Sequence, residues 1–130
     1  MITDNYIKMC EQAEEIQKVW KPKIGDIFFT TLVKSINIYV DGFAFLPNHN
    51  VSLSVLYIWL PIQEQLQDMY GYKMPIHKIA FITRARYLID KLYNFEYNNE
   101  YTDMNELWLA FVMHEKYNKI WTGEKWIYFT

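Results

Sequence analysis

The segment from Met104 to Lys119 constrains the fold most strongly, because its pattern predicts a helix that is apolar on nearly every side. Asp103, followed by Glu106 three residues later, resembles a capping box with Asp in place of Ser or Thr, and it marks the start of this helix. One apolar stripe comprises Met104, Leu107, Trp108, Phe111 and Val112, and a second, on nearly the opposite side, comprises Leu109, Met113 and Ile120. Such a helix must be sandwiched between layers or used at an interface.

Hiding both stripes is demanding for a chain of 130 residues, which forms one core with few layers. We therefore expect a single domain over residues 1–130. One way to cover the second stripe is a homodimer, in which another copy packs against it. The other way is for this chain, which is rich in aromatic side chains, to enclose the helix without a second copy. The sequence leaves both open.

Apolar periodicity predicts three further helices. The first runs from Asp4 to Trp20, begins at a cap formed by Thr3 or Asp4, and stops before Pro22. A short helix begins at Pro61 and stops at Gly71, and a third runs from Ile76 towards Phe95. The buried stripe of the first helix is expected to comprise Tyr6, Met9, Cys10, Ala13, Ile16 and Trp20.

The region between Lys23 and Leu60 changes to β-branched and aromatic residues, which favour strands. Asp41-Gly42 suits a tight turn, so Phe43 to Leu46 is expected to return against Ile36 to Val40 as a hairpin. Another turn at Thr122-Gly123 precedes a predicted terminal strand. The central strand candidates are Ile27 to Val33, Ile36 to Val40 and Ser52 to Leu60.

These elements follow the order α-β-β-β-α-α-α-β. Helices and strands in such an order do not alternate as βαβ units. The expected fold class is therefore α+β, with a small, mostly antiparallel sheet packed against about four helices.

Composition places the chain among ordinary globular proteins, with 52% apolar and 22% charged residues. Its net charge of -2 excludes a global positive field that would draw it onto nucleic acid or an acidic membrane. The segment Met1 to Gln12 lacks the pattern of a secretory signal, and the apolar runs are too short to span a bilayer, so we expect the cytoplasm of a bacterial host cell. Cys10 is the only cysteine, which excludes an intramolecular disulfide and predicts an inert buried thiol. No cofactor is expected.

Aromatic residues reach 18%, and Lys greatly outnumbers Arg. These features fit either stacking platforms for bases or sugars, or the codon usage of a low-GC genome.

About half of the chain resembles a family of small uncharacterised phage and prophage proteins of low-GC Gram-positive bacteria. The resemblance rests on three segments. The first contains Ile16-Gln17, Trp20 and Gly25-Asp26; the second contains Trp59-Leu60-Pro61, Gln63, Gln65-Leu66-Gln67 and Met69; the third contains Leu107 to Met113, Glu115 to Lys119, Trp121, Gly123 and Trp126. The family has no assigned activity or catalytic residues, so the resemblance implies a phage or prophage setting and no mechanism.

The sequence contains no glycine-rich phosphate loop and none of the common motifs of metalloproteases, serine hydrolases or calcium sites. Its histidines, His49, His77 and His114, stand in separate segments. The only enzymatic hypothesis is a site assembled in three dimensions from His77, His114 and Glu115.

Charge is unevenly distributed along the chain. The segment from Lys73 to Lys91 carries a net charge of +4, and the segment from Asn94 to Glu115 carries -5. These segments either neutralise one another through surface pairs, or expose Arg84 and Lys91 on one helix face to contact phosphates. The second interpretation makes the chain a nucleic-acid-binding module.

Three other residues are candidates for interaction. Glu115 shares the apolar stripe of its helix, where it either pairs with Lys119 or is desolvated without a cationic partner. Trp121 and Trp126 flank the turn at Gly123, so we expect them to be partly exposed. There they either hold a partner or close a hairpin against the first helix. Because the core pattern is complete and no catalytic constellation is visible, we expect an accessory protein that acts through protein contacts.

Overall fold

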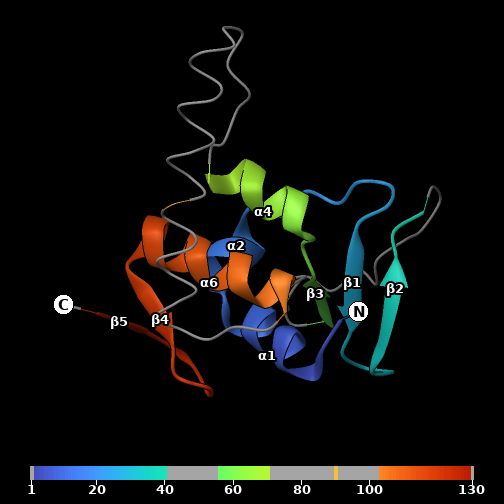
Figure 1. Cartoon of the computed structure of the whole chain (residues 1–130). Helices are drawn as coiled ribbons and strands as arrows, with labels where there is room; N and C mark the ends of the chain where they lie inside the picture. The colour runs from blue at the N-terminus through green and yellow to red at the C-terminus, as the bar shows by residue number, and fades with distance from the viewer. Residues whose placement is uncertain (1, 41–55, 71–89, 91–102, 130) are drawn as a thin grey trace, which may run out of the picture.

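The computed structural model describes residues 2–40, 56–70, 90 and 103–129, and Figure 1 shows how its elements are arranged. Within these residues the chain forms four helices and five short strands. In chain order they are α1 (Asp4–Gln12), α2 (Glu14–Lys18), β1 (Ile27–Thr30), β2 (Ser35–Ile38), β3 (Tyr57–Trp59), α4 (Gln63–Tyr70), α6 (Met104–Tyr117), β4 (Lys119–Trp121) and β5 (Trp126–Tyr128). All strand pairs are antiparallel, and the predicted α+β class is confirmed.

Two predicted features lie outside the described residues. One is the turn at Asp41-Gly42 with the returning strand from Phe43 to Leu46. The other is the helix from Ile76 to Phe95, of which only Asp90 is described.

Helix α6 forms the centre of the core. Its N-cap is Asp103, whose Oδ1 accepts a hydrogen bond from the backbone N–H of Glu106 at 2.9 Å, as the sequence predicted. Every residue from Glu106 to Met113 is buried, because α1, α4 and β4 pack around the helix. Both apolar stripes are thus largely covered within one chain, and the homodimer is not needed to hide them. The helix ends at Tyr117, before the predicted Lys119, because Asn118 adopts the left-handed conformation with φ of 56°.

The first predicted helix is divided into α1 and α2 at Ala13, which has non-helical angles (φ -86°, ψ 76°). The expected single helix from Asp4 to Trp20 is therefore wrong. The apolar stripe still faces the core, since all of its members except the half-buried Trp20 are fully buried. Thr3 caps α1 by accepting from the backbone N–H of Tyr6 at 2.9 Å.

The three central strands form a sheet in the order β2-β1-β3. Strand β1 ends at Thr30, before the predicted Val33, and β2 ends at Ile38, before the predicted Val40. In the register of the sheet, Phe29 of β1 lies between Ile36 of β2 and Ile58 of β3. Figure 1 shows the sheet at one side of the helices, with β2 farthest from them. Among the described strands β2 lies at the edge of this sheet, and its isoleucine side chains are exposed.

The opposite edge of the sheet, at β3, is sealed by the side chain of Gln17 from α2. Its Nε2 donates to the carbonyl of Trp59 at 2.9 Å and to that of Cys10 at 3.1 Å, and its Oε1 accepts from the N–H of Trp59 at 2.8 Å. One amide side chain therefore pairs with β3 as a neighbouring strand would. It also satisfies the carbonyl of Cys10 near the break between α1 and α2.

Strands β4 and β5 form a separate hairpin, in which Trp121 pairs with Trp126 across a turn that contains Gly123 at φ 99°. The sequence predicted one terminal strand, and the structure shows that the residues before the turn form its partner. The indole Nε1 of Trp126 donates to the carbonyl of Met9 at 3.0 Å, which fixes the hairpin against α1. No helix within the described part of the chain has the length and apolar character needed to cross a membrane.

Candidate functional site

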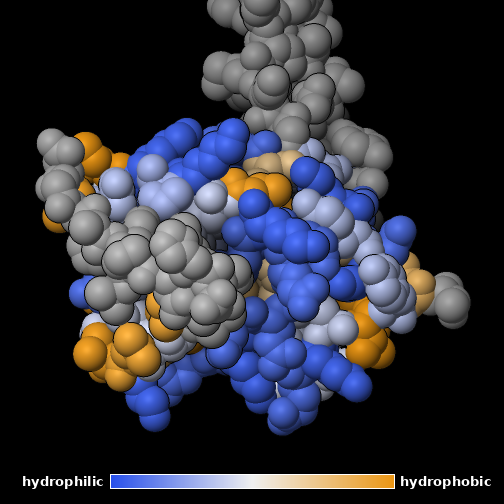
Figure 2. Space-filling view, turned by 180° about the vertical axis from the view of Figure 1, so that it is seen from behind, coloured by the Kyte–Doolittle hydropathy of each residue, from blue (hydrophilic) through white to orange (hydrophobic). Residues whose placement is uncertain are grey.

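Strand β2, which lies at the edge of the described sheet, and the residues on either side of it carry five strongly exposed apolar side chains. Their exposed fractions are 65% for Leu32, 70% for Val33, 47% for Ile36, 59% for Ile38 and 52% for Val40. Figure 2, which views the molecule from behind, shows hydrophobic residues along the edge where this strand lies. We call this set the β2 surface. It continues the inner face of the sheet, which is fully covered at Ile58 and becomes exposed at β2.

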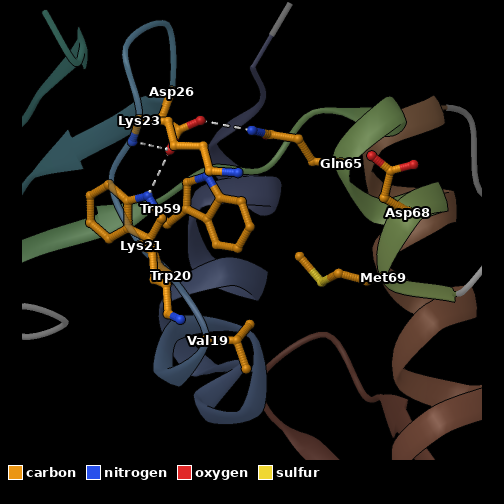
Figure 3. Close-up of a pocket in the computed structure, with 9 residues that line it drawn as sticks. All are labelled: Val19, Trp20, Lys21, Lys23, Asp26, Trp59, Gln65, Asp68 and Met69. Carbon is orange, nitrogen blue, oxygen red and sulfur yellow. Dashed lines mark hydrogen bonds between the residues drawn. The ribbon is translucent and has the colours of Figure 1, made fainter.

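A second feature is a pocket of about 270 Å³ between the α2–β1 connection and α4. Figure 3 shows its lining side chains, which come from the α2–β1 connection on one side and from α4 on the other, with β3 contributing Trp59. The apolar lining residues are Val19, Trp20, Trp59 and Met69, and the polar ones are Lys21, Lys23, Asp26, Gln65 and Asp68.

Asp26 joins the two sides of this pocket. Its Oδ2 accepts from the indole Nε1 of Trp20 at 3.0 Å and from the backbone N–H of Lys23 at 2.9 Å, and its Oδ1 accepts from Nε2 of Gln65 at 2.7 Å. The residue is only 5% exposed. A buried carboxylate is tolerated when several donors satisfy its oxygens. These bonds therefore hold the tryptophan, the loop and α4 in fixed positions.

The indoles of Trp20 and Trp59 form the aromatic wall of the pocket. Their ring centroids are 6.2 Å apart and their planes differ by 5°, which is an offset stack. Trp20 also contacts Phe28, with centroids 6.0 Å apart. Trp59 is a buried core residue, and its Nε1 has no acceptor among the described residues.

Charged side chains at the mouth of the pocket are exposed. Lys21 and Lys23 belong to the α2–β1 connection, and Asp68 belongs to α4. Within the described part of the chain, none of the three forms an ion pair. The pocket therefore combines an aromatic wall with both signs of charge at its mouth.

Of the candidate residues from the sequence, Arg84, Lys91 and His77 lie outside the described residues. Glu115 is half-buried, and its Oε1 lies 3.4 Å from Nδ1 of His114. The pair between Glu115 and Lys119, one of the two alternatives from the sequence, does not form, because Lys119 pairs with a different acid. Lys119 Nζ lies 2.6 Å from Oε1 of Glu15 on α2, and hydrogen bonding to that carboxylate raises the pKa of Lys119.

The ring of His114 stacks on Phe129, with centroids 4.5 Å apart and planes differing by 12°. Within the described ranges, no group of three His, Cys, Asp or Glu side chains is arranged to hold a metal ion.

The two tryptophans of the terminal hairpin differ from the expectation. Trp126 is buried rather than partly exposed, because it packs against α1 and donates to Met9. Trp121 is half-buried and contacts Trp126, with ring centroids 5.1 Å apart. Closing the hairpin against the first helix is the role that the geometry supports.

Cys10 is fully buried, as predicted, and burial raises the pKa of its thiol. Cys10 is therefore a core side chain. It lies beside Tyr6, and burial also raises the pKa of the Tyr6 hydroxyl. A thiol held in its protonated form is a poor nucleophile.

Sequence reasoning did not single out the residues of the pocket as a site. Residues from two of the segments on which the expected family resemblance rests do meet here. Trp20 and Asp26 belong to the first, and Trp59 and Gln65 to the second. Comparison with protein-family models, curated proteins and solved structures finds no match to this chain.

Proposed function

We propose that this chain is a non-enzymatic accessory protein of the phage or prophage type, which binds another protein by adding a strand to the outer edge of β2. The observation that carries the proposal is the β2 surface. The resemblance of three segments to phage and prophage proteins supports the setting.

The backbone of β2 is suited to this role. The amide of Tyr39 donates to the carbonyl of Asp26 at 2.7 Å, and Gly25 donates to the carbonyl of Tyr39 at 2.8 Å. Since antiparallel strands direct alternate residues to each neighbour, Ile36 and Ile38 direct their backbone groups away from β1. Within the described part of the chain, no strand pairs with this outer edge. The sequence predicts that Phe43 to Leu46, which lies outside the described residues, returns along this strand, so the partner segment that we propose would take the place of that return.

The side chains favour the same partner. A long apolar edge is an aggregation hazard that folded proteins usually block with charges, and between Leu32 and Val40 the only charged residue is Lys34. A partner strand with apolar side chains on one face would cover Ile36 and Ile38 while pairing with their backbone. An acidic residue near Lys34 would add complementarity. The partner we propose is thus an extended, mainly apolar segment of another protein.

The proposal is tested by immobilising the protein and capturing binding proteins from extracts of a low-GC Gram-positive host. The bound partner is identified by mass spectrometry and then purified. Ile38→Lys places a charge on the edge and should weaken its binding at least about tenfold. Ile24→Lys is the matched control, because Ile24 is 70% exposed but lies outside β2, and it should bind like the parent.

Hydrogen exchange supplies the second criterion. The backbone amides of Ile36 and Ile38 should exchange more slowly in the complex, because strand addition gives them acceptors. A partner that binds the Ile38→Lys variant as tightly as the parent would refute the proposal, as would protection confined to other elements. If no protein is captured in an Ile38-dependent way, the proposal fails.

A second copy of the chain is the competing occupant. The mass measured by sedimentation over a hundredfold dilution distinguishes self-association from binding of another protein. A dimer that dissociates on dilution and is abolished by Ile38→Lys would replace the foreign partner with self-association.

A further inference from the structure

The pocket between the α2–β1 connection and α4 is independent of the β2 surface. No residue that lines it belongs to β2 or to the turn before it. Its walls are held together by the buried carboxylate of Asp26, which binds Trp20 on one side and Gln65 on the other. The pocket is therefore built by fixed contacts and not by chance proximity of surface side chains.

The apolar part of the pocket favours a planar group. Because the Trp20 and Trp59 rings are offset, part of each ring face is left uncovered by the other. Figure 3 shows Met69 of α4 facing these indoles across the pocket. Aromatic faces and a thioether on opposite walls are suited to a flat ring placed between them.

The size of the pocket limits what can enter. Its volume of about 270 Å³ lies below the range of about 300 to 1,000 Å³ that is usual for drug-sized ligands. The pocket is therefore suited to one aromatic ring with a short polar chain.

The charges at the mouth define the polar part of that ligand. Lys21 and Lys23 supply positive charge from the α2–β1 connection, and Asp68 supplies a carboxylate from α4. The Asp26 carboxylate already accepts three hydrogen bonds, so Asp68 is the acid left to bind a ligand. A ligand that carries one negative and one positive group can satisfy both sides, whereas a simple anion or cation satisfies one and is repelled by the other.

We infer that this pocket binds a small zwitterion with a planar apolar body, which is the chemical class of the free aromatic amino acids. The ring lies against Trp20 and Trp59, the ammonium group faces Asp68, and the carboxylate faces Lys21 and Lys23. This binding site adds a ligand-dependent property to a protein whose proposed partner binds elsewhere.

L-Phenylalanine is the probe, because its ring does not obscure indole signals. Titration into the ¹⁵N-labelled protein should shift the indole N–H resonances of Trp20 and Trp59, with a Kd of the order of 1 mM. Three comparison compounds each lack one feature. They are 3-phenylpropionate without the ammonium group, phenethylamine without the carboxylate, and L-alanine without the ring. Each should bind about tenfold more weakly or not at all.

Variants locate the charges. Asp68→Asn should weaken L-phenylalanine about tenfold and leave 3-phenylpropionate unchanged or bound more tightly. The double variant with Lys21→Gln and Lys23→Gln should also bind L-phenylalanine about tenfold more weakly. It should bind phenethylamine as tightly as the parent does, or more tightly. Glu64→Gln is the matched control, since Glu64 is exposed on α4 but does not line the pocket.

The inference is overturned if L-phenylalanine moves neither indole resonance at about ten times the expected Kd. It is also overturned if phenethylamine or 3-phenylpropionate binds the parent as tightly, or if Asp68→Asn leaves the affinity unchanged. None of these outcomes bears on strand addition at β2, so the two proposals fail separately.

Discussion

Replacing Gln17 with Met removes the amide that seals the outer edge of β3 while keeping a side chain of similar length. Three hydrogen bonds are lost, two with the backbone of Trp59 and one with the carbonyl of Cys10. Gln17 is 7% exposed, so water has little access to the groups left behind. Each buried bond contributes about 1 kcal/mol, and orphaned backbone partners raise the cost of removing it. The expected loss of unfolding free energy is therefore about 3 kcal/mol.

Urea unfolding followed by tryptophan fluorescence measures this loss. With a slope near 2 kcal/mol per molar urea, the midpoint should fall by about 1.5 M. Gln17→Glu provides a stricter comparison, since it keeps the acceptor for the N–H of Trp59 but turns a carboxylate oxygen towards two carbonyls. At pH 7 it should destabilise the fold more than Gln17→Met does.

Gln12→Met is the matched control, because Gln12 is exposed at the end of α1. Its unfolding free energy should stay within about 0.5 kcal/mol of the parent. If Gln17→Met loses less than about 1 kcal/mol, the amide does not act as a substitute strand and the reasoning is refuted.

Three further predictions concern other contacts. Cys10 should react with a thiol reagent more than about a hundredfold faster in denaturant than in the native state, and equal rates would contradict its burial. Glu15→Gln should cost about 0.5 kcal/mol at pH 7, since its pair with Lys119 is partly exposed. Because the folded pKa of Lys119 is raised, this contribution is present below its unfolded pKa of about 10.4 and is lost as pH rises through the folded value. If the urea midpoints of the parent and Glu15→Gln differ by the same amount at pH 7 and pH 11, the linkage is excluded. Asn118→Ala should lower the melting temperature by about 4 °C, whereas Asn118→Gly should not, because the position has a positive φ; similar melting of both variants would argue against strain.

Local patterns in the sequence were sufficient to find the main elements. The stripe of Tyr6, Met9 and Ile16 predicted the buried face of the first helices, and Asp103 predicted where α6 begins. These features depend on residues three or four positions apart, so periodicity and capping rules detect them.

The errors arise where a distant contact decides the local structure. The break at Ala13 is accompanied by bonds between Gln17 and Trp59, 42 residues later in the chain, and no local rule contains this pairing. Trp126 is buried because a carbonyl of α1 accepts from its indole, 117 residues away. The expected exposure rested on the nearby glycine turn alone.

The pocket shows the same limit. Asp26 stands in a loop whose sequence looks solvated, and its partner Gln65 is 39 positions away. The β2 surface was hidden for another reason. Its alternating isoleucines predict a strand, but whether a strand lies at the centre or the edge of a sheet depends on pairing order, which periodicity does not contain.

The contacts of α1 also determine when this protein can fold. Thr3 donates to Glu106 at 3.0 Å, Lys8 contacts Glu124 at 3.1 Å, and Met9 accepts from Trp126 at 3.0 Å. Ribosomes add about 5 to 20 residues per second, so about 6 to 23 s pass between the synthesis of α1 and that of Trp126. During this interval α1 can contact β3, but for most of it α1 lacks α6 and the terminal hairpin, which complete its burial. The nascent chain should therefore remain sensitive to proteases and available to chaperones until β5 has been made, and pairing over such sequence distances should slow its folding.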